Sequence, residues 1–179
     1  MERQPILEGQ RVILRPMTEA DREALFRVAS DPLLWEQHPA PDRWKPEVFG
    51  ALFDEGLHSG GALAVLERAS GRIIGSSSLR RTPLDPAAAE IGWTYLAREF
   101  WGGTINREVK RLLLAHALAS VPRVLFRVGE SNWRSRKALE KIGANLTELE
   151  ERIERGGRMV RHVVYEITRD SFARGPLAA

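Results

Sequence analysis

A pair of glycines between a predicted strand and a predicted helix is the most suggestive chemical feature of the sequence. Gly102 and Gly103 follow the strand-like run 89–96 and precede a helix that begins near Ile105. Glycine lets the backbone approach a ligand closely, and the first turn of a helix offers unpaired N–H groups and the positive end of its dipole. The turn therefore predicts a phosphate site, although a glycine pair also suits an ordinary turn into a helix.

The helix after the glycines is predicted to be amphipathic. Its apolar side has helical spacing, in the order Ile105, Val109, Leu112 and His116. Its basic side chains fall on the other side, which we expect to face solvent: Arg107, Lys110 and Arg111.

A later helix carries a serine that can do chemistry. Asn132 or Ser131 is expected to cap its start, and Gly143 to end it. Its inward stripe has the spacing i, i+3, i+4 and i+7: Ser135, Ala138, Leu139 and Ile142. An interior hydroxyl needs a partner. That partner is either the carbonyl one turn earlier in the helix or a group outside the helix.

Composition bounds the class of protein. The chain has 179 residues, 43% of them hydrophobic, which predicts one domain over 1–179 with a core at about 8–170. The 27 basic and 24 acidic side chains form no block of like charge, so no direct nucleic-acid partner is indicated. Without cysteine, and with four widely spaced histidines, no metal site is expected. The charged first 17 residues predict no signal peptide and no membrane span, hence a cytoplasmic protein.

The loop between the first two predicted helices has unusually large side chains. Trp35, His38 and Trp44 lie in a segment that also holds four prolines after Asp31. Proline makes such a loop rigid. It is either a hydrophobic plug at a helix junction or one wall of a substrate pocket.

Hydrophobic periodicity and turn residues predict the remaining elements. The order is strand, two helices, three strands, helix, strand, helix and a final hairpin. The expected bounds are 10–16, 18–30, 47–58, 62–68, 72–80, 87–96, 105–120, 123–128, 132–143, 145–154 and 159–168, with a turn at Arg155-Gly156-Gly157 and a loose tail over 169–179.

This order resembles that of the GCN5-related N-acetyltransferase (GNAT) family, and three local motifs agree with it. The motifs are the run 7–16 followed by Glu19-Ala20-Asp21, the turn 100–103, and the helix 132–144. Together they resemble the branch that acetylates the N-termini of ribosomal proteins (RimJ/RimL type). The resemblance covers nearly the whole chain. It implies an α/β (α+β) fold with a central mixed, mostly antiparallel, twisted sheet of about seven strands and helices on both faces.

The resemblance also implies acetyl-CoA as the acetyl donor. The family turn, Arg/Gln-x-x-Gly-x-Gly/Ala, wraps the pyrophosphate with backbone amides. Here the three defined positions of that pattern are Glu99, Gly102 and Thr104. Glu99 and Thr104 differ from the family residues, and Glu99 brings a negative charge toward the phosphates. The implied cofactor-binding residues are Trp93, Thr94, Tyr95, Leu96, Trp101, Gly102, Gly103, Thr104, Ile105, Asn106, Asn132 and Arg136.

Two of these groups have distinct implied tasks. The strand 93–96 resembles the family strand that splays from its neighbour and pairs with the pantetheine arm. Asn132 resembles the asparagine that holds this arm, and Arg136 would meet the adenosine phosphates. The alternative is that basic residues at the start of this helix are simply exposed to solvent.

Acetyl transfer to an amine needs a base for the amine and an acid for the departing thiolate. Glu90, on the strand that should flank the acetyl group, is the expected base, although a lone strand carboxylate is also compatible with an ordinary arginine pair. Many relatives use a tyrosine as the acid, at the position that Leu139 holds here. Since leucine has no proton to give, the resemblance passes this role to Ser135. A backbone N–H of the segment 94–96 would hold the oxyanion.

The expected function is therefore an acetyl-CoA-dependent N-acetyltransferase. The acceptor is a primary amine, either a protein N-terminus or a small molecule, which attacks directly in a ternary complex. Trp35, His38 and Trp44 would bind this acceptor, and the resemblance allows a homodimer. Two alternatives stay open: transfer of a longer acyl group, and a non-catalytic acyl-CoA-binding sensor or assembly domain, which the departures at Glu99, Thr104 and Leu139 motivate.

Overall fold

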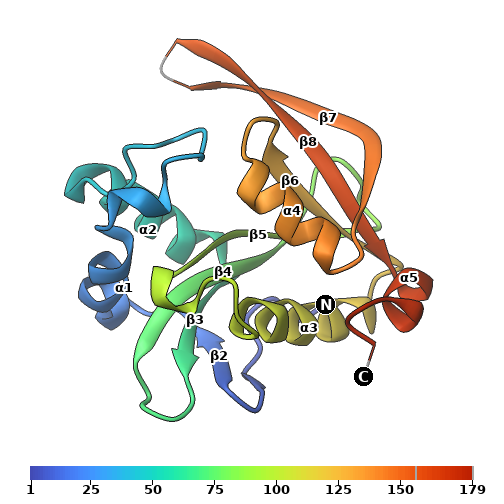
Figure 1. Ribbon diagram of the computed structural model, residues 1–179, viewed down its shortest axis with the longest axis horizontal. Coiled ribbons are helices and arrows are strands. Elements are labelled where there is room, and N and C mark those ends of the chain that lie inside the picture. The colour runs from blue at the N-terminus through green and yellow to red at the C-terminus, as the bar shows by residue number, and fades with distance from the viewer. Residues whose placement is uncertain (156, 179) are drawn as a thin grey trace.

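An eight-stranded mixed sheet runs through the computed structural model, which describes residues 1–155 and 157–178 (Figure 1). The strands lie in the order β1-β2-β3-β4-β5-β6-β8-β7, and every pair is antiparallel except β5 with β6. Their bounds are β1 Leu7–Glu8, β2 Val12–Pro16, β3 Ala62–Glu67, β4 Ile73–Arg81, β5 Ala89–Leu96, β6 Arg123–Gly129, β7 Asn145–Arg155 and β8 Arg158–Thr168. The predicted mixed, mostly antiparallel sheet is confirmed. It has one strand more than expected, because a two-residue strand carries no sequence pattern.

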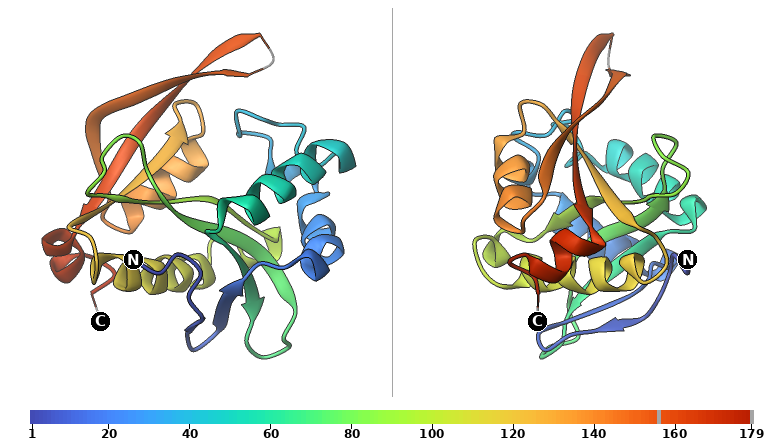
Figure 2. Two further views of the ribbon diagram at one scale, coloured as in Figure 1. Left: turned by 180° about the vertical axis from the view of Figure 1, so that it is seen from behind. Right: turned by 90° about the vertical axis from the view of Figure 1, so that its right-hand side faces the viewer.

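Helices cover both faces of the sheet, as predicted (Figures 1 and 2). Neighbouring residues of β3 show this, since Ala62 packs with the cluster of α1 and α2 while Leu63 packs with the cluster of α3 and α4. Side chains alternate between the faces of a strand, so the two clusters lie on opposite sides. The helices are α1 Arg22–Ala29, α2 Pro46–Ser59, α3 Ile105–Leu118, α4 Trp133–Lys141 and α5 Arg169–Arg174.

The residues predicted to cap and to end α4 do so in the structure. Asn132 caps the helix, because its side chain accepts a hydrogen bond from the N–H of Ser135. Gly143 follows the helix with φ at 86°, a left-handed conformation that favours glycine. The turn predicted at Arg155-Gly156-Gly157 includes Gly156, and the predicted tail includes Ala179; both residues lie outside the described part of the chain.

The parallel pair β5 and β6 separates after two residues, which opens the sheet in its middle. The strands pair only at Ala89 with Val124 and at Glu90 with Leu125. Beyond Glu90 the edge of β5 that faces β6 therefore has no strand partner among the described residues. The predicted splay of this strand is confirmed, and it leaves backbone groups free to pair with another extended chain.

A bulge in β5 bends the strand at the same place. Its register against β4 shifts between Ser76 and Ser78, and opposite that shift Trp93 has φ at 52°, the left-handed region that a tryptophan seldom adopts. The bulge turns the Trp93 ring between the guanidinium of Arg80, 3.6 Å from the ring centroid, and that of Arg127, at 5.9 Å. Strain of this kind is common at functional sites.

No helix in the described ranges 1–155 and 157–178 is long and apolar enough to cross a bilayer.

Candidate active site

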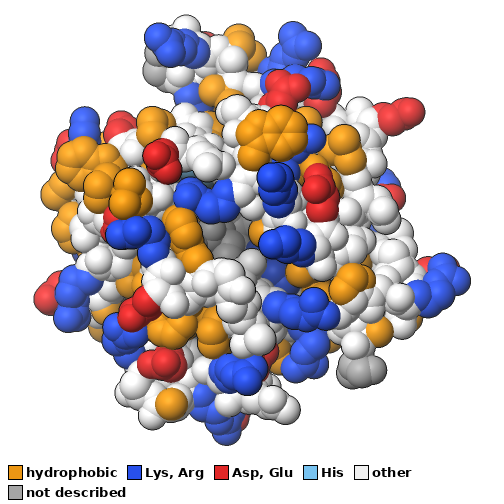
Figure 3. Space-filling model, viewed as in Figure 1, with side chains coloured by type: hydrophobic (Ala, Val, Ile, Leu, Met, Phe, Trp, Pro, Cys, Tyr) orange, Lys and Arg blue, Asp and Glu red, His pale blue; other side chains and the backbone are white. Residues whose placement is uncertain are grey.

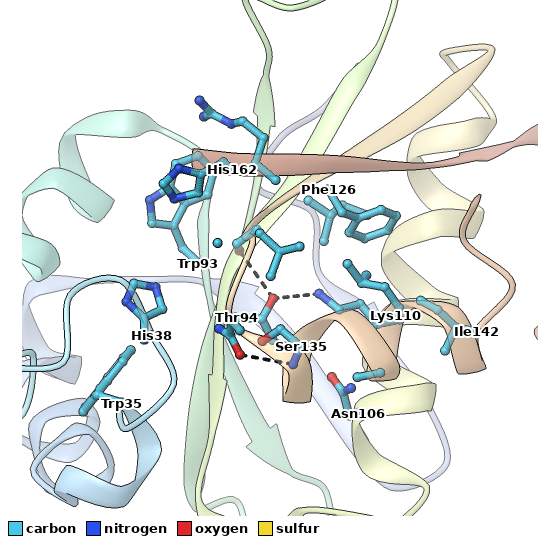
Figure 4. A pocket seen from close by; sticks show the side chains of 18 of the residues that line it. Trp35, His38, Trp93, Thr94, Asn106, Lys110, Phe126, Ser135, Ile142 and His162 are labelled. Carbon is cyan, nitrogen blue, oxygen red and sulfur yellow. Dashed lines mark hydrogen bonds between the residues drawn. The ribbon is translucent and has the colours of Figure 1, made fainter. Parts of the chain in front are cut away.

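A cavity of about 190 Å³ occupies the opening between β5 and β6. The face of the molecule shown in Figure 3 is hollowed near its middle, with Lys and Arg side chains around the hollow. Figure 4 shows the lining side chains converging from β5, β6, α3, α4 and the loop before α2. The lining consists of Trp35, His38, Arg43, Ile91, Gly92, Trp93, Thr94, Asn106, Lys110, Phe126, Arg127, Val128, Gly129, Asn132, Ser135, Ala138, Leu139, Ile142 and His162.

The glycine turn lies at the start of α3, beside this cavity. Gly102 has φ at 71°, and a Cβ placed on it would meet nothing within 4 Å. In the described part of the chain, no hydrogen-bond acceptor pairs with the amides of residues 102–107. Amides of this kind, at the positive end of a 14-residue helix, are groups that can donate hydrogen bonds to an anion. Asn106, in the first turn, lines the cavity itself, while Ile105 is buried in the core.

The two residues that depart from the family pattern do not disturb this turn. Glu99 points to Arg72, whose Nη2 donates to its carboxylate at 2.7 Å. The hydroxyl of Thr104 accepts from Nη1 of Arg11 at 3.0 Å. Both side chains are engaged with partners in other segments, so the negative charge that we expected Glu99 to bring is balanced by an arginine.

Trp101 fixes the loop to the end of β5. Its indole Nε1 donates to the carbonyl of Leu96 at 3.0 Å, and the guanidinium of Arg134 lies 4.2 Å from its ring centroid. Nη2 of Arg134 also donates to the carbonyl of Leu34 at 2.9 Å. The start of α4, the glycine turn and the loop after α1 are thereby held together.

The predicted solvent exposure of Lys110 on α3 is wrong. We expected this side chain in solvent, but it is only 6% exposed and lines the cavity, because α3 is enclosed by both the sheet and the cavity wall. Its Nζ donates to Oγ1 of Thr94 at 2.7 Å (Figure 4). This hydroxyl also shares a hydrogen bond with Ser77 at 2.8 Å. Burial lowers the pKa of Lys110 to about 7.

This burial predicts a pH-dependent stability. Between about pH 7 and the ordinary lysine pKa of 10.5, Lys110 is protonated in the unfolded chain but largely neutral in the folded one. Stability should therefore rise with pH across this window, by up to about 1.4 kcal/mol per pH unit. Urea unfolding at pH 7.5 and 9.5 should show this gain in the wild type relative to Lys110→Met. Parallel pH dependences of the two proteins would contradict it.

Ser135 lies on the cavity wall, one helical turn from the Asn132 cap. Figure 4 shows it between Thr94 of β5 and the body of α4. Its backbone N–H donates to Oδ1 of Asn132 at 3.2 Å, and none of the described residues hydrogen-bonds its hydroxyl. The predicted inward stripe is confirmed, since Ser135, Ala138, Leu139 and Ile142 all line the cavity. The bond back to the helix carbonyl, which was the other interpretation of this serine, is not formed.

Glu90 lies behind the cavity wall rather than on it. It is 2% exposed, and its Oε1 accepts from Nε of Arg127 at 2.7 Å. Its second oxygen is buried without a hydrogen-bond partner in the described chain. Arg127 lines the cavity and also pairs with Glu151 of β7. The structure therefore favours the arginine-paired interpretation of Glu90 over a carboxylate in direct contact with substrate.

The loop before α2 contributes only part of its predicted wall. Trp35 and His38 line the cavity, whereas Trp44 is 39% exposed and lies outside it. Trp35 is anchored, since its indole Nε1 donates to the carbonyl of Ala29 at 2.7 Å and its ring packs in the core cluster of α1 and α2. Both interpretations of this loop thus hold for Trp35, which plugs a helix junction and borders the pocket.

Three predicted cofactor residues have side chains directed elsewhere. Tyr95 packs with the cluster of α1 and α2, and Leu96 with the cluster of α3. Neither residue lines the cavity, and the carbonyl of Leu96 already accepts from Nε1 of Trp101. Nε of Arg136 donates to the hydroxyl of Tyr165 at 3.1 Å, and its guanidinium lies 4.3 Å from the ring centroid of Trp133. Arg136 is outside the cavity lining.

Sequence reasoning missed four cavity residues that carry charged or titratable groups: Arg43, Lys110, Arg127 and His162. Arg43 follows Pro41-Asp42 in an irregular loop, where no periodicity tells which side chains turn inward. His162 begins a run of four consecutive buried residues in β8, 162–165, so both sides of the strand are covered there and strand alternation does not single it out.

Comparisons with known proteins agree with this geometry. A family model described as an acetyltransferase (GNAT) domain matches residues 11–145. A crystal structure assigned as an acetyltransferase is 31% identical, covers 94% of this chain and 89% of its own, and has a TM-score of 0.79. An assigned acetyltransferase from T. thermophilus is 29% identical, with coverage of 97% and 93% and a TM-score of 0.77.

A more distant structure shares the fold and holds a coenzyme. Mycobacterium smegmatis RimJ, solved in complex with CoA-disulfide, is 19% identical, covers 93% of this chain and 86% of its own, and has a TM-score of 0.70. The family match spans most of the described chain and includes the glycine turn, Asn132 and Ser135. This chain is a member of the GNAT acetyltransferase family.

Proposed function

We propose that this protein is an acetyl-CoA-dependent N-acetyltransferase that moves the acetyl group to a primary amine by direct attack in a ternary complex. The observation that carries the proposal is the opening between β5 and β6, which has free amides at one end and Ser135 on its wall. The family membership and the CoA-disulfide complex of RimJ support a CoA thioester as the donor. The likeness to RimJ also supports the RimJ/RimL-type branch.

The proposed coenzyme path follows the free groups of the cavity. The pyrophosphate accepts hydrogen bonds from the amides of the glycine turn at the start of α3. The pantetheine arm lies along the unpaired edge of β5 as an added strand, near Asn132. The thioester then lies beside Ser135, and a backbone N–H of the segment 94–96 holds the developing oxyanion.

The proposed reaction transfers the acetyl group from the thioester sulfur to the amine nitrogen. The amine nitrogen forms a bond to the thioester carbonyl carbon, and the carbon–sulfur bond breaks. Ser135 donates a proton to the departing thiolate, and a base takes one from the attacking nitrogen, so that an amide and free CoA leave. Solvent then returns a proton to Ser135 and removes one from the base, which restores both groups. Because no carboxylate lines the cavity in the described chain, we assign acceptance of the amine proton to His162. Burial, followed by the charge of Arg155, holds the pKa of His162 below its usual range, so the ring is neutral at pH 7.

Glu90 then has a positioning role, since it holds Arg127 at the cavity wall. We expect His162→Gln to lower kcat roughly 100-fold, within the range of general base catalysis, and Glu90→Gln to lower kcat/KM by less than about 10-fold. Steady-state rates over pH 6–9 test the two roles. A larger loss of kcat for Glu90→Gln than for His162→Gln would return the base role to Glu90.

The function itself is tested by release of free thiol. Purified protein is incubated with acetyl-CoA and a panel of small amines and peptides, and CoA binding is measured in parallel by calorimetry. Amine-dependent thiol release with formation of the acetylated amine is the expected result. Tight CoA binding without any such release would favour the acyl-CoA-binding sensor or assembly domain instead.

A further inference from the structure

Two hydrogen-bond donors face each other at the acceptor side of the cavity. Nδ1 of His38 accepts from the backbone N–H of Ala40 at 2.9 Å. A neutral imidazole that accepts at Nδ1 carries its hydrogen at Nε2. That Nε2 lies 3.1 Å from Nη1 of Arg43, and a guanidinium can only donate. An acceptor atom beside the pair would satisfy both groups.

The guanidinium of Arg43 lies 5.5 Å from the ring centroid of Trp35, but among the described residues it has no carboxylate partner. The side chain is buried, with 8% exposed, and no carboxylate of the described residues forms an ion pair with it. Glu55 and Asp42 act on it only at longer range, and Glu55 is paired with Arg80 at 2.7 Å. Burial, followed by the like charge of Arg155, lowers the pKa of Arg43 to about 10. A buried charge of this kind is costly unless an anion pairs with it.

Other groups around the pair do not supply that anion. Arg127, the next cation of the wall, is already paired with Glu90 and Glu151. His38 is kept neutral, since burial and the charge of Arg43 lower its pKa to about 3. The cavity lining contains no Asp or Glu in the described chain. The acceptor side of the cavity therefore attracts negative charge.

We propose that the acceptor is a small primary amine that carries a carboxylate, as an amino acid does. One carboxylate oxygen accepts from Nη1 of Arg43 and Nε2 of His38, which orients the amine toward the thioester. The rings of Trp35 and Trp93 form the sides of this subsite. This inference rests on the proposed acetyl transfer and names its substrate class.

The experiment compares matched pairs of acceptors that differ only in charge. A panel of amino acids, their carboxamides and simple diamines is assayed with acetyl-CoA by thiol release. We expect kcat/KM for the carboxylates to exceed that of the matched carboxamides roughly 10- to 100-fold, the size of a hydrogen bond to a charged group. Short peptides with free N-termini form a further arm of the panel.

Two variants locate the effect. Arg43→Met keeps the length of the side chain without its charge and should remove the preference, so that kcat/KM for the carboxylates falls to that of the matched carboxamides. His38→Phe keeps an aromatic ring without its N–H and should reduce the preference by roughly 3- to 10-fold. Arg68→Met is the matched control, because Arg68 is an exposed arginine that pairs with Glu8 far from the cavity. It should behave as the wild type. If the melting curve shows that Arg43→Met does not fold, the carboxylate preference of His38→Phe tests the inference instead.

Equal acetylation of carboxylates and carboxamides, or a clear preference for peptide N-termini, would overturn the inference while leaving the proposed N-acetyltransferase intact. A preference that survives both Arg43→Met and His38→Phe would also overturn it. Failure of every amine despite CoA binding would overturn the proposed function, and this inference with it.

Discussion

Replacing Ser135 by alanine is expected to lower kcat by about 10²- to 10⁴-fold, the usual contribution of a positioned acid. Ser135 lines the cavity, its hydroxyl has no hydrogen-bond partner in the described chain, and the neighbouring Leu139 has no proton to give. The affinity for CoA should change little, because the backbone N–H of Ser135, which completes the Asn132 cap, is unaffected by the substitution. Stopped-flow or steady-state thiol release gives kcat, and calorimetry gives the Kd for CoA.

Ser131→Ala is the matched control for Ser135→Ala. Ser131 lies just before the start of α4, but it is exposed and outside the cavity lining. It should retain full turnover. If Ser135→Ala also retains full turnover, the thiolate leaves without help from this hydroxyl, and the assigned acid is wrong. A parallel loss of CoA affinity in Ser135→Ala would mean that the serine serves binding rather than proton transfer.

Replacing Gly102 by valine should weaken CoA binding by at least about 10-fold, equivalent to about 1.4 kcal/mol. A Cβ at this position has free space, so the effect does not come from a clash within the protein. It comes from the φ of 71°, which a β-branched residue adopts only at a cost of about 1–3 kcal/mol. The loop is therefore expected to change conformation and to turn its free amides away from the pyrophosphate. Calorimetric titration with CoA measures the change.

Gly71→Val separates this local effect from lost stability. Gly71 has nearly the same φ, 70°, and an added Cβ also meets nothing within 4 Å, but the residue lies in the turn between β3 and β4. Both variants should lose similar stability in urea unfolding, while only Gly102→Val loses CoA affinity. Unchanged CoA affinity in Gly102→Val would place the pyrophosphate away from this turn.

The sequence predicted the fold through local signals that tertiary packing did not override. The apolar stripe of α4, its Asn132 cap and the Gly143 stop are all formed as expected. Caps and turns depend on a few neighbouring residues, so they can be predicted from the sequence alone. The short strand β1 was missed, because two residues are too few to display a period.

The placement of polar side chains could not be predicted in the same way. Lys110 looked solvent-exposed because a helical wheel assumes that one side of a helix is open to water, whereas α3 borders a cavity as well as the sheet. Glu90 fell on the predicted strand, but its pairing with Arg127 joins residues 37 positions apart. Contacts of that sequence separation exist only once the sheet has assembled.

The sequence by itself determined the order of elements, the glycine turn before α3, and an inward serine on α4, because each depends on residue types at short spacing. The family resemblance predicted that β5 splays, but only the tertiary structure decided that the splay begins after Glu90. It also decided that His38 and Arg43 meet as two donors beside the opening. These features arise where segments distant in sequence come together, and the charges and hydrogen-bond partners of a cavity are properties of that assembly.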